Sequence, residues 1–196
     1  MHIAERILDV PLHNDYGEFL AAAYRTRSGD VSEEHLLLYR SLEVRPLPVR
    51  VNSACFTSDI FGCRRCDCRW QLQFAMRYIA RAGAGLIIYH LAHEGRANGL
   101  VAKLRAQDAG AREGLRSKLA YEVLGFPADP RRYEATAAIL HDLNVREIAL
   151  MSNSPHKRRC LEDLGINVAT TISVRSPDAT LEDLYAWKRQ DFGHDV

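Results

Sequence analysis

Hydrophobic and polar residues follow two different periods along the chain, and the mixture predicts both strands and helices. Short apolar runs, in places alternating with polar residues, are typical of strands. Such runs predict strands over residues 33–38, 46–51, 85–90, 146–151 and 166–174. Apolar residues three or four positions apart are typical of an amphipathic helix. This spacing predicts helices over residues 69–82 and 132–143.

Residue types that favour helix ends indicate two further helices. Ser154 followed by Pro155 predicts a helix start, because serine caps the first free N–H groups and proline fits the first turn. This helix is expected to end near Gly165. Thr180 with Asp183 resembles a capping box and predicts a last helix. Strands that alternate with helices predict an α/β fold, a mixed sheet with flanking helices and functional loops at the strand ends.

Length and composition are those of an ordinary globular protein. The chain has 196 residues, of which 47% are hydrophobic and 26% charged, so we expect a single domain over residues 1–196. The 26 Lys and Arg residues nearly balance the 25 Asp and Glu residues, for a formal charge of +1. This balance argues against a nucleic acid polymer or an anionic membrane as the partner. Charged residues interrupt the first six positions, and no apolar run approaches the roughly 18 residues that span a bilayer, which predicts a cytoplasmic protein.

Four of the five cysteines lie between residues 55 and 68. Cysteines of a cytoplasmic protein are mostly reduced, so a cluster favours metal binding or catalysis over disulfides. Cys55, Cys66 and Cys68 could hold Zn²⁺ with three thiolates and leave a fourth position for water, as catalytic zinc sites do. Cys63 could instead complete the four-ligand shell of a structural zinc. The spacing alone also leaves room for a set of buried or incidental thiols.

Two segments around these cysteines resemble the zinc-site segment of the GTP cyclohydrolase II family. In that family an Arg-Val-His-Ser-Glu-Cys stretch is followed, ten residues later, by Cys-Asp-Cys and then a glutamine. This chain keeps that spacing, with RVNSAC ending at Cys55, CDC beginning at Cys66, and then Gln71. The resemblance implies that Cys55, Cys66 and Cys68 bind Zn²⁺, and it leaves Cys63 outside the ligand set. A zinc ion held in this way lowers the pKa of its bound water toward about 7.

Four further segments resemble the same family in the same order along the chain. They cover residues 93–106, 124–133, 151–157 and 161–168, so the resemblance extends from about residue 10 to residue 175. It implies the α/β fold of GTP cyclohydrolase II, a nucleotide substrate and a homodimer. It also implies the family reaction, in which hydrolysis at C8 of the guanine of GTP opens the ring and releases formate and pyrophosphate. Zn²⁺ is the implied cofactor, and Mg²⁺ could accompany the substrate phosphates.

The resemblance assigns catalytic roles to Asp129 and Arg131. In the family an arginine attacks the α-phosphorus of the nucleotide, and a nearby aspartate accepts its proton. Such a role needs an adjacent base, because an arginine side chain is protonated in water. Without the resemblance, an ion pair between residues two apart in a proline-rich turn would be the simpler interpretation.

The same correspondences imply a set of substrate-binding residues. Arg50, Arg96, Ser152 and Lys157 would hold phosphates, Gln71 and Glu94 would contact the base edge, and Asn52, Ser53, Gly95 and Ser117 complete the set. Ser152 precedes a predicted helix start, where free N–H groups and the helix dipole favour an anion. A solvated basic helix face is the alternative interpretation of Lys157. His90, His93 and His156 are expected to be loop or surface residues.

The chain departs from the family pattern at residues near the base. The family's tyrosine after Lys-x-Arg-Ala is replaced by Gln107 or deleted, and its histidine and glutamate before the first cysteine are Asn52 and Ala54. Tyr121 could supply a phenol from another turn. Three hypotheses therefore stay open: a zinc-dependent cyclohydrolase of GTP, a related enzyme that opens the ring of a uridine nucleotide, and a nucleotide-binding protein with structural zinc and no turnover.

Overall fold

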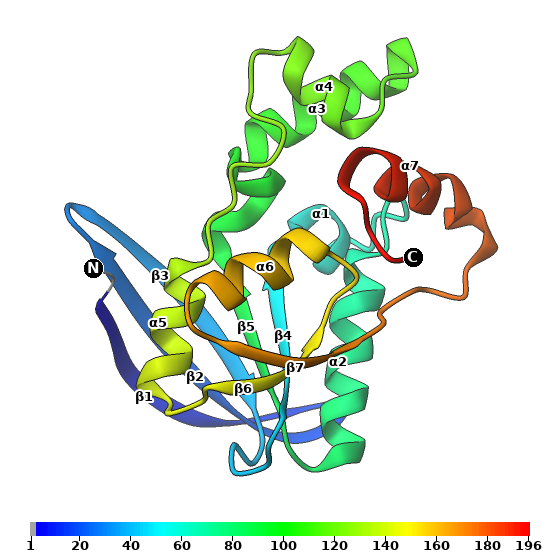
Figure 1. Ribbon diagram of the computed structural model, residues 1–196. Helices are drawn as coiled ribbons and strands as arrows, with labels where there is room; N and C mark the ends of the chain where they lie inside the picture. Colours follow the sequence, from blue (N-terminus) through cyan, green and yellow to red (C-terminus); the bar gives the residue numbers. More distant parts are fainter. Residues whose placement is uncertain (1–2) are drawn as a thin grey trace.

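The computed structural model describes residues 3–196, apart from the side chain of Ser117. Within these residues, seven strands form one mixed sheet in the order β1-β2-β3-β5-β4-β6-β7 (Figure 1). The strands are β1 Ile3–Asn14, β2 Gly17–Ser28, β3 Val31–Tyr39, β4 Leu47–Ser53, β5 Leu86–His90, β6 Glu147–Met151 and β7 Asn167–Ile172. Strands β4 to β7 run parallel, whereas β1 with β2, β2 with β3 and β3 with β5 pair antiparallel. The predicted α/β class with a mixed sheet is confirmed.

Helices cover both faces of the sheet and give the body three layers (Figure 1). The helices are α1 Phe56–Asp59, α2 Cys68–Ala82, α3 Gly99–Glu113, α4 Ser117–Val123, α5 Glu134–Asp142, α6 Pro155–Asp163 and α7 Glu182–Phe192, with 3₁₀ helices η1 Leu91–Ala97 and η2 Ala179–Leu181. α2 packs on one face through Ala75 and Ile79. α5 and α6 pack on the other through Ile139, Leu140 and Leu161. In residues 3–196 no helix is long and apolar enough to cross a membrane.

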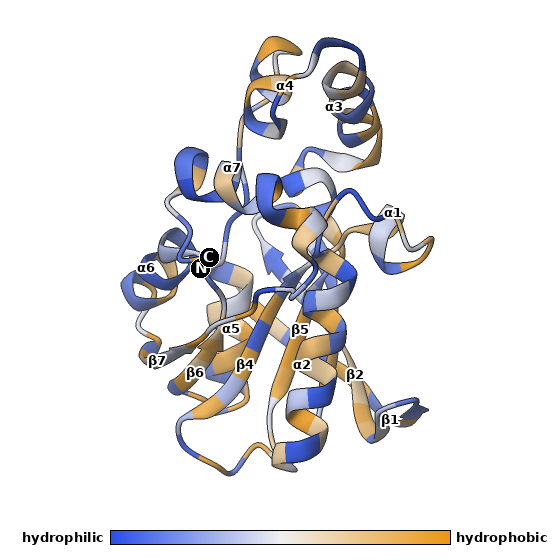
Figure 2. Ribbon diagram, turned by 90° about the vertical axis from the view of Figure 1, so that its right-hand side faces the viewer, coloured by the Kyte–Doolittle hydropathy of each residue, from blue (hydrophilic) through white to orange (hydrophobic). Residues whose placement is uncertain are grey.

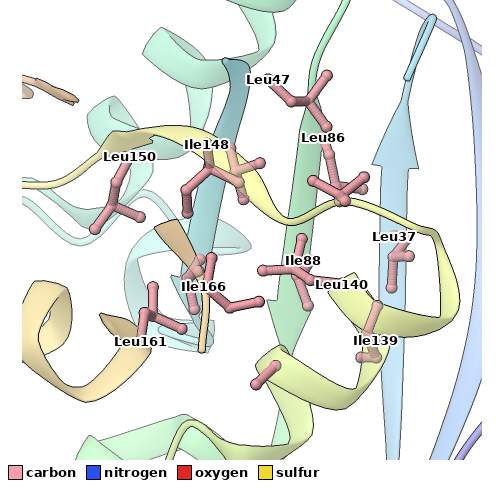
Figure 3. Close-up of a cluster of buried hydrophobic side chains, with 14 of the residues drawn as sticks. Leu37, Leu47, Leu86, Ile88, Ile139, Leu140, Ile148, Leu150, Leu161 and Ile166 are labelled. Atoms are coloured by element: carbon pink, nitrogen blue, oxygen red, sulfur yellow. The ribbon is translucent and has the colours of Figure 1, made fainter. Parts of the chain in front are cut away.

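The inner parallel strands β4, β5 and β6 are buried on both faces, which explains the nearly continuous apolar sequences of β5 and β6. On β5, Leu86 and Ile88 pack toward α5 and α6, and Ile87 packs toward α2. Figure 2 shows this apolar character along β5 and β6, and Figure 3 shows the cluster between the sheet and α5. β4 differs, because it buries the polar residues Arg50 and Asn52 next to its valines. These two residues place polar side chains near the carboxyl end of β4, where a functional site can form.

The predicted strands and helices are all present, with ends that shift by at most two residues. Ser154 caps α6 as predicted, since its Oγ accepts the backbone N–H of Lys157 at 3.3 Å. The capping box predicted at Thr180 and Asp183 is wrong. Asp178 Oδ1 accepts the backbone N–H of Thr180 at 3.0 Å and caps η2 instead. η2 then leads directly into α7, so the start of α7 needs no separate capping side chain.

Two parts of the structure have no counterpart among the predicted elements. The hairpin β1–β2 forms one edge of the sheet, where β1 is exposed along nearly its whole length and therefore lacks an alternating pattern. Helices α3 and α4, which we call the arm, stand beyond the ends of the parallel strands (Figure 1). The arm has its own small apolar cluster, made mostly of alanines. Gly114 ends α3 in the left-handed conformation, with φ 67°.

Candidate functional site

The carboxyl ends of β4, β5 and β6 meet at one edge of the sheet, because the three strands run parallel. A cavity of about 530 Å³ opens at this edge, with walls from the strand ends, the arm and α7. The predicted site residues that line it are Arg50, Asn52, Ser53, Cys55, Cys66, Cys68, Gln71, Glu94, Gly95, Arg96, Arg131, Ser152 and Lys157. Asp129 joins them through its contact with Arg131. The side chain of Ser117 lies outside the described part of the structure.

Three cysteines converge at the cavity wall. The Sγ atoms of Cys55, Cys66 and Cys68 all lie within 4.8 Å of one another, and those of Cys55 and Cys66 are 3.7 Å apart. Cys55 directly precedes α1 and Cys68 begins α2, so two helix starts hold the cluster. Helix starts favour thiolates, because their free N–H groups and dipoles stabilise negative charge. In the described chain Cys63 is not part of this cluster, as the resemblance implied.

The three sulfurs fit a zinc ion. Zinc sites take thiolate ligands, and three of them leave one position open. Hydrogen bonds from Cys66 and Cys68 hold the pKa of Cys55 well below its ordinary range, and the contact with Cys55 raises the pKa of Cys66 to about 11. A divalent cation would offset the repulsion among three ionised sulfurs, so these cysteines are the residues that could hold the metal.

A buried ion pair supports Cys55 from the arm. Lys103 Nζ, on α3, lies 3.0 Å from Cys55 Sγ and 2.7 Å from Glu94 Oε1. Glu94 also accepts the backbone N–H of Phe56 at 2.6 Å and that of Gly95 at 2.7 Å. The carboxylate of Glu94 thus holds the loop that carries Cys55, and its contact with a base edge stays a prediction. Sequence reasoning placed Lys103 in a motif, but no local pattern indicated that its ammonium group would meet a cysteine.

A strained turn places Gly95 and Arg96 at the cavity. Gly95, Arg96 and Ala97 have φ angles of 58°, 58° and 67°. Non-glycine residues in this region each cost about 1–3 kcal/mol and gather at ligand sites. A Cβ on Gly95 would lie 3.1 Å from Cβ of Lys103 and 3.3 Å from Oη of Tyr121, so the position requires glycine. The turn therefore brings backbone close to the cysteine cluster.

Arg131 and Asp129 form a bidentate pair inside the molecule. Arg131 Nε donates to Asp129 Oδ1 at 2.7 Å, and Nη2 donates to Oδ2. The side chains are 19% and 16% exposed, so this is not an ordinary solvated surface pair. Arg131 Nη1 also donates to Ser53 Oγ at 3.3 Å, which connects the pair to the end of β4. Although burial raises the pKa of Asp129, hydrogen bonds from Arg131 hold it below its ordinary value.

Several cationic side chains line the cavity, among them Arg50, Arg96, Arg131 and Lys157. Burial lowers the pKa of Lys157 well below its ordinary value, and the charges of Arg50 and Arg131 lower it further. Lys157 Nζ donates to the backbone carbonyl of Val51 at 2.7 Å. Among the described residues it has no carboxylate partner. Desolvated cations that repel one another are stabilised by an anion, so the cavity suits a polyanionic ligand.

Gln71, on α2, has its amide held from both sides. Its Nε2 donates to Asp67 Oδ2 at 2.7 Å, and its Oε1 accepts Arg50 Nη2 at 2.5 Å. Arg50 is held in turn, since its Nε donates to Asn52 Oδ1 at 3.2 Å. These contacts fix the amide orientation and leave one N–H and one lone pair of Gln71 for a ligand. Asp67 was not among the predicted site residues.

The positions that depart from the family pattern also line the cavity. They are Asn52, Ala54 and Gln107. Tyr121, on α4, lines it as well, with a buried ring and its hydroxyl beside Gly95. A phenol is therefore present at the cavity wall, supplied by α4 and not by α3.

Two histidines are buried, so the expectation that they are loop or surface residues is wrong. His90 ends β5 and is fully buried, and His93 is 4% exposed. Their rings stack with centroids 4.4 Å apart. His90 Nε2 contacts Thr136 Oγ1 on α5 at 2.8 Å, and His93 Nδ1 lies 3.3 Å from Ser53 Oγ. Helix α5 covers this strand end, which the local sequence did not indicate. His156 is exposed, as expected.

Known proteins are similar in sequence to this chain over most of its length. The family model of GTP cyclohydrolase II matches residues 5–173. A GTP cyclohydrolase-2 of Streptomyces coelicolor is 41% identical over 192 residues, which cover 97% of this chain and 86% of that protein. Riboflavin biosynthesis proteins RibBA of Mycobacterium avium and Mycobacterium tuberculosis are 40% and 39% identical over 98% of this chain, which spans 46% of each of those proteins.

A solved structure gives a weaker likeness. It is the crystal structure of RibBX, a two-domain 3,4-dihydroxy-2-butanone 4-phosphate synthase from A. baumannii. The match has a TM-score of 0.43 and 20% identity, over 89% of this chain and 40% of that one. A likeness of this size decides neither the fold nor the activity of this chain.

The sequence matches define the class of protein first. The chain is a hydrolase that acts on carbon–nitrogen bonds. It belongs to the GTP cyclohydrolase II family, because the family model covers most of its length and a GTP cyclohydrolase-2 is 41% identical to it.

Proposed function

We propose that this chain is a zinc-dependent nucleotide cyclohydrolase with GTP as its first candidate substrate. The observation that carries the proposal is the presence of a three-cysteine cluster and several cationic side chains in one cavity. The cluster can hold a metal next to a base, and the cations can hold the phosphates of the same nucleotide. The proposed reaction is hydrolysis at C8 of guanine, which opens the ring and releases formate, together with release of pyrophosphate.

Cys55, Cys66 and Cys68 would hold the Zn²⁺. When bound, the ion supplies an acidified water and Lewis acidity at neutral pH. Lys103 keeps a positive charge 3.0 Å from the sulfur of Cys55, which favours its thiolate form. Glu94 holds Lys103 and the start of α1 in place, so the cluster keeps its shape before a metal or nucleotide arrives.

On the phosphate side, Arg131 and Asp129 would cleave the triphosphate. A bond would form between a guanidinium nitrogen of Arg131 and the α-phosphorus, and the bond between the α-phosphorus and the bridging oxygen would break. Pyrophosphate leaves, and the guanidinium proton goes to Asp129, which already accepts two N–H groups of Arg131. The residues proposed to hold the phosphates are Arg50, Arg96, Ser152 and Lys157, with Ser53 beside them. Ser117 is added on the family resemblance alone.

On the base side, Gln71 and Glu94 would read the base edge, with Gly95 allowing close backbone approach. A uridine nucleotide is the second candidate, favoured by the cavity lining. Asn52, Ala54 and Gln107 stand there in place of the family's imidazole, carboxylate and phenol. The 41% identity to a GTP cyclohydrolase-2 favours GTP. A nucleotide-binding protein without turnover is the third candidate, and it would leave the Asp129–Arg131 pair without a reaction.

The remaining features of the proposal come from the family resemblance. We propose one GTP cyclohydrolase II-like domain over residues 1–196, working as a homodimer in the cytoplasm. Neither a nucleic acid polymer nor a membrane is proposed as a partner. Mg²⁺ could accompany the substrate phosphates.

A nucleotide panel tests the proposal. Zinc-loaded protein is incubated with GTP, GMP, ATP, UTP and UMP, and the products are identified by mass spectrometry with a parallel formate assay. GTP is expected to yield formate and a ring-opened product. Consumption of UTP or UMP alone would favour the uridine enzyme. Recovery of every nucleotide intact, with saturable binding of one of them, would favour the binding protein.

A further inference from the structure

Helix α7 and the residues after it form one wall of the cavity. Trp187, Lys188, Phe192 and His194 line the cavity from this segment. Figure 1 shows α7 beside the arm and the ends of the parallel strands, and Figure 2 shows it below α4. The family model ends at residue 173, so it does not describe this wall.

Lys188 connects α7 to the cysteine loop. Its Nζ donates to Asp67 Oδ1 at 2.6 Å, and the side chain of Asp67 is only 1% exposed. Asp67 lies between Cys66 and Cys68, and its other oxygen accepts Gln71 Nε2 at 2.7 Å. A buried carboxylate is stable only with a charge partner and satisfied lone pairs. Lys188 therefore balances the group that fixes the amide of Gln71.

Phe192 supports a second residue of the site. The guanidinium carbon of Arg96 lies 4.3 Å from the ring centroid of Phe192 and 6.0 Å from that of Tyr121. A guanidinium so close to an aromatic face is attracted by the ring and restricted in orientation. One of the two rings beside Arg96 thus comes from α7.

Further contacts hold α7 between the arm and the body. Arg116 donates to Gln190 Oε1 at 2.5 Å and lies 3.8 Å from Asp191. After α7, the backbone N–H of Asp195 donates to the carbonyl of Asn153, two residues after β6, at 2.8 Å. The segment is therefore fixed at both sides of the cavity and is not a loose tail.

We propose that α7 is part of the nucleotide site, with Lys188 and Phe192 as positioning residues. Lys188 acts through Asp67 on Gln71, and Phe192 acts on Arg96. The ligand is a nucleoside triphosphate, and discrimination between bases depends on the amide of Gln71 being held in one orientation. This inference rests on the proposed function, because that function makes Gln71 and Arg96 contacts of the nucleotide.

Trp187 is a direct probe of this wall. The chain has two tryptophans, and the other, Trp70, stacks on Phe74 and does not line the cavity. Trp70→Phe therefore leaves Trp187 as the only tryptophan emitter. Rapid mixing of this zinc-loaded variant with GTP should change the emission of Trp187 in a saturable way.

Substitutions in that background separate positioning from simple packing. Lys188→Met and Phe192→Leu should each weaken GTP binding about tenfold and reduce the preference for GTP over UTP. Lys188→Arg keeps the charge and should restore binding to within about threefold of the parent. Asp183→Asn removes one charge from an exposed position of the same helix that does not line the cavity, and binding should stay within about twofold. With Gln71→Ala already present, Lys188→Met should weaken binding little further, because the two residues act in one chain of contacts.

The outcomes distinguish failure of the role of α7 from failure of the proposed function. Lys188→Met and Phe192→Leu proteins that bind GTP as tightly as Asp183→Asn would overturn the role of α7 and leave the proposed function standing. Fully additive losses from Lys188→Met and Gln71→Ala would also overturn it. If the parent protein neither responds to nor consumes any nucleotide, the proposed function fails, and the role of α7 fails with it.

Discussion

Asp129 and Arg131 share two hydrogen bonds between their side chains although they are only two positions apart in the chain. The pair keeps the guanidinium charged. Burial would lower the pKa of Arg131, but the influence of Tyr133 and the hydrogen bonds to Asp129 outweigh it and raise this pKa. A charged guanidinium is a poor nucleophile, so an attack on phosphorus requires a nearby base. The resting pair already places that base on the N–H groups from which the proton would leave.

We expect Arg131→Ala to lower pyrophosphate release from GTP by about a hundredfold or more, because the reacting nitrogen is removed. Arg132→Ala is the matched control, since Arg132 is 79% exposed and pairs with Glu134 outside the cavity. A pyrophosphate assay on the two zinc-loaded variants measures the difference. Equal release from both would show that the Asp129–Arg131 pair is structural. If the substrate is a monophosphate, pyrophosphate never appears, and Arg131 serves as a binding cation.

Metal content tests the ligand set. The protein should carry about one zinc per chain, bound by three thiolates. Cys66→Ser should lose this zinc because it removes one sulfur from the cluster. Cys63→Ser should retain it, because Cys63 is not among the clustered cysteines of the described chain. Elemental analysis by mass spectrometry measures the zinc content of both variants. If Cys63→Ser loses the zinc and Cys66→Ser keeps it, the assigned ligand set is wrong.

Tyr121→Phe tests whether the phenol from α4 takes part in ring opening. The hydroxyl of Tyr121 lies at the cavity wall beside Gly95, and Lys103 lines the same cavity. We expect kcat for formate release to fall about tenfold or more, with zinc content unchanged. Tyr78→Phe removes a hydroxyl from α2 that does not line the cavity, and it should leave kcat unchanged. If kcat is unaltered in both variants, the hydroxyl of Tyr121 takes no part in ring opening and the side chain serves only in packing.

The buried His93 predicts how stability depends on pH. Burial, with the charges of Arg131 and Lys157, lowers the pKa of His93 to about 3, below its ordinary value of 6.5. Between these values the unfolded chain binds a proton that the folded chain does not, so stability falls as the pH drops below about 6.5. From pH 7.5 to pH 5.5 one such histidine lowers the free energy of unfolding by about 1.4 kcal/mol.

Chemical denaturation at the two pH values measures this loss. His93→Gln should reduce the difference between pH 7.5 and pH 5.5 by about 1.4 kcal/mol. His156→Gln is the control, because that side chain is exposed in the fold. The same pH difference in wild type and His93→Gln would mean that His93 can be protonated inside the folded protein.

The sequence predicted those elements whose burial imposes a local pattern. β5 is covered on both faces, which gives a short continuous apolar run, and α2 is covered on one face, which gives apolar residues at the period of a helix. β1 was missed because Ile7, Leu8 and Val10 are all exposed, and exposed edge residues follow no period. α3 was missed because it buries little beyond two alanines and Lys103.

The site could be predicted from the sequence only where a motif fixes the spacing of the residues. The spacing of the cysteines left Cys63 open as a fourth ligand. The family resemblance implied Cys55, Cys66 and Cys68, and the structure brings these three together. The supporting residues come from far along the chain. Lys103 lies 48 positions from Cys55, and Lys188 lies 121 positions from Asp67. Such contacts arise from the packing of the arm and α7 against the sheet, and no short segment encodes them.

Formate released from GTP in water enriched in heavy oxygen is the most direct measurement of the central claim. If a zinc-dependent hydrolysis opens the base, zinc-loaded protein will release formate that carries the label, in equal amount to the ring-opened product. Protein stripped of zinc by a chelator will release none, and restoring zinc will restore the release. If zinc-loaded protein releases no formate and leaves GTP and the other purine and pyrimidine nucleotides intact, the claim that this chain is a nucleotide cyclohydrolase is contradicted.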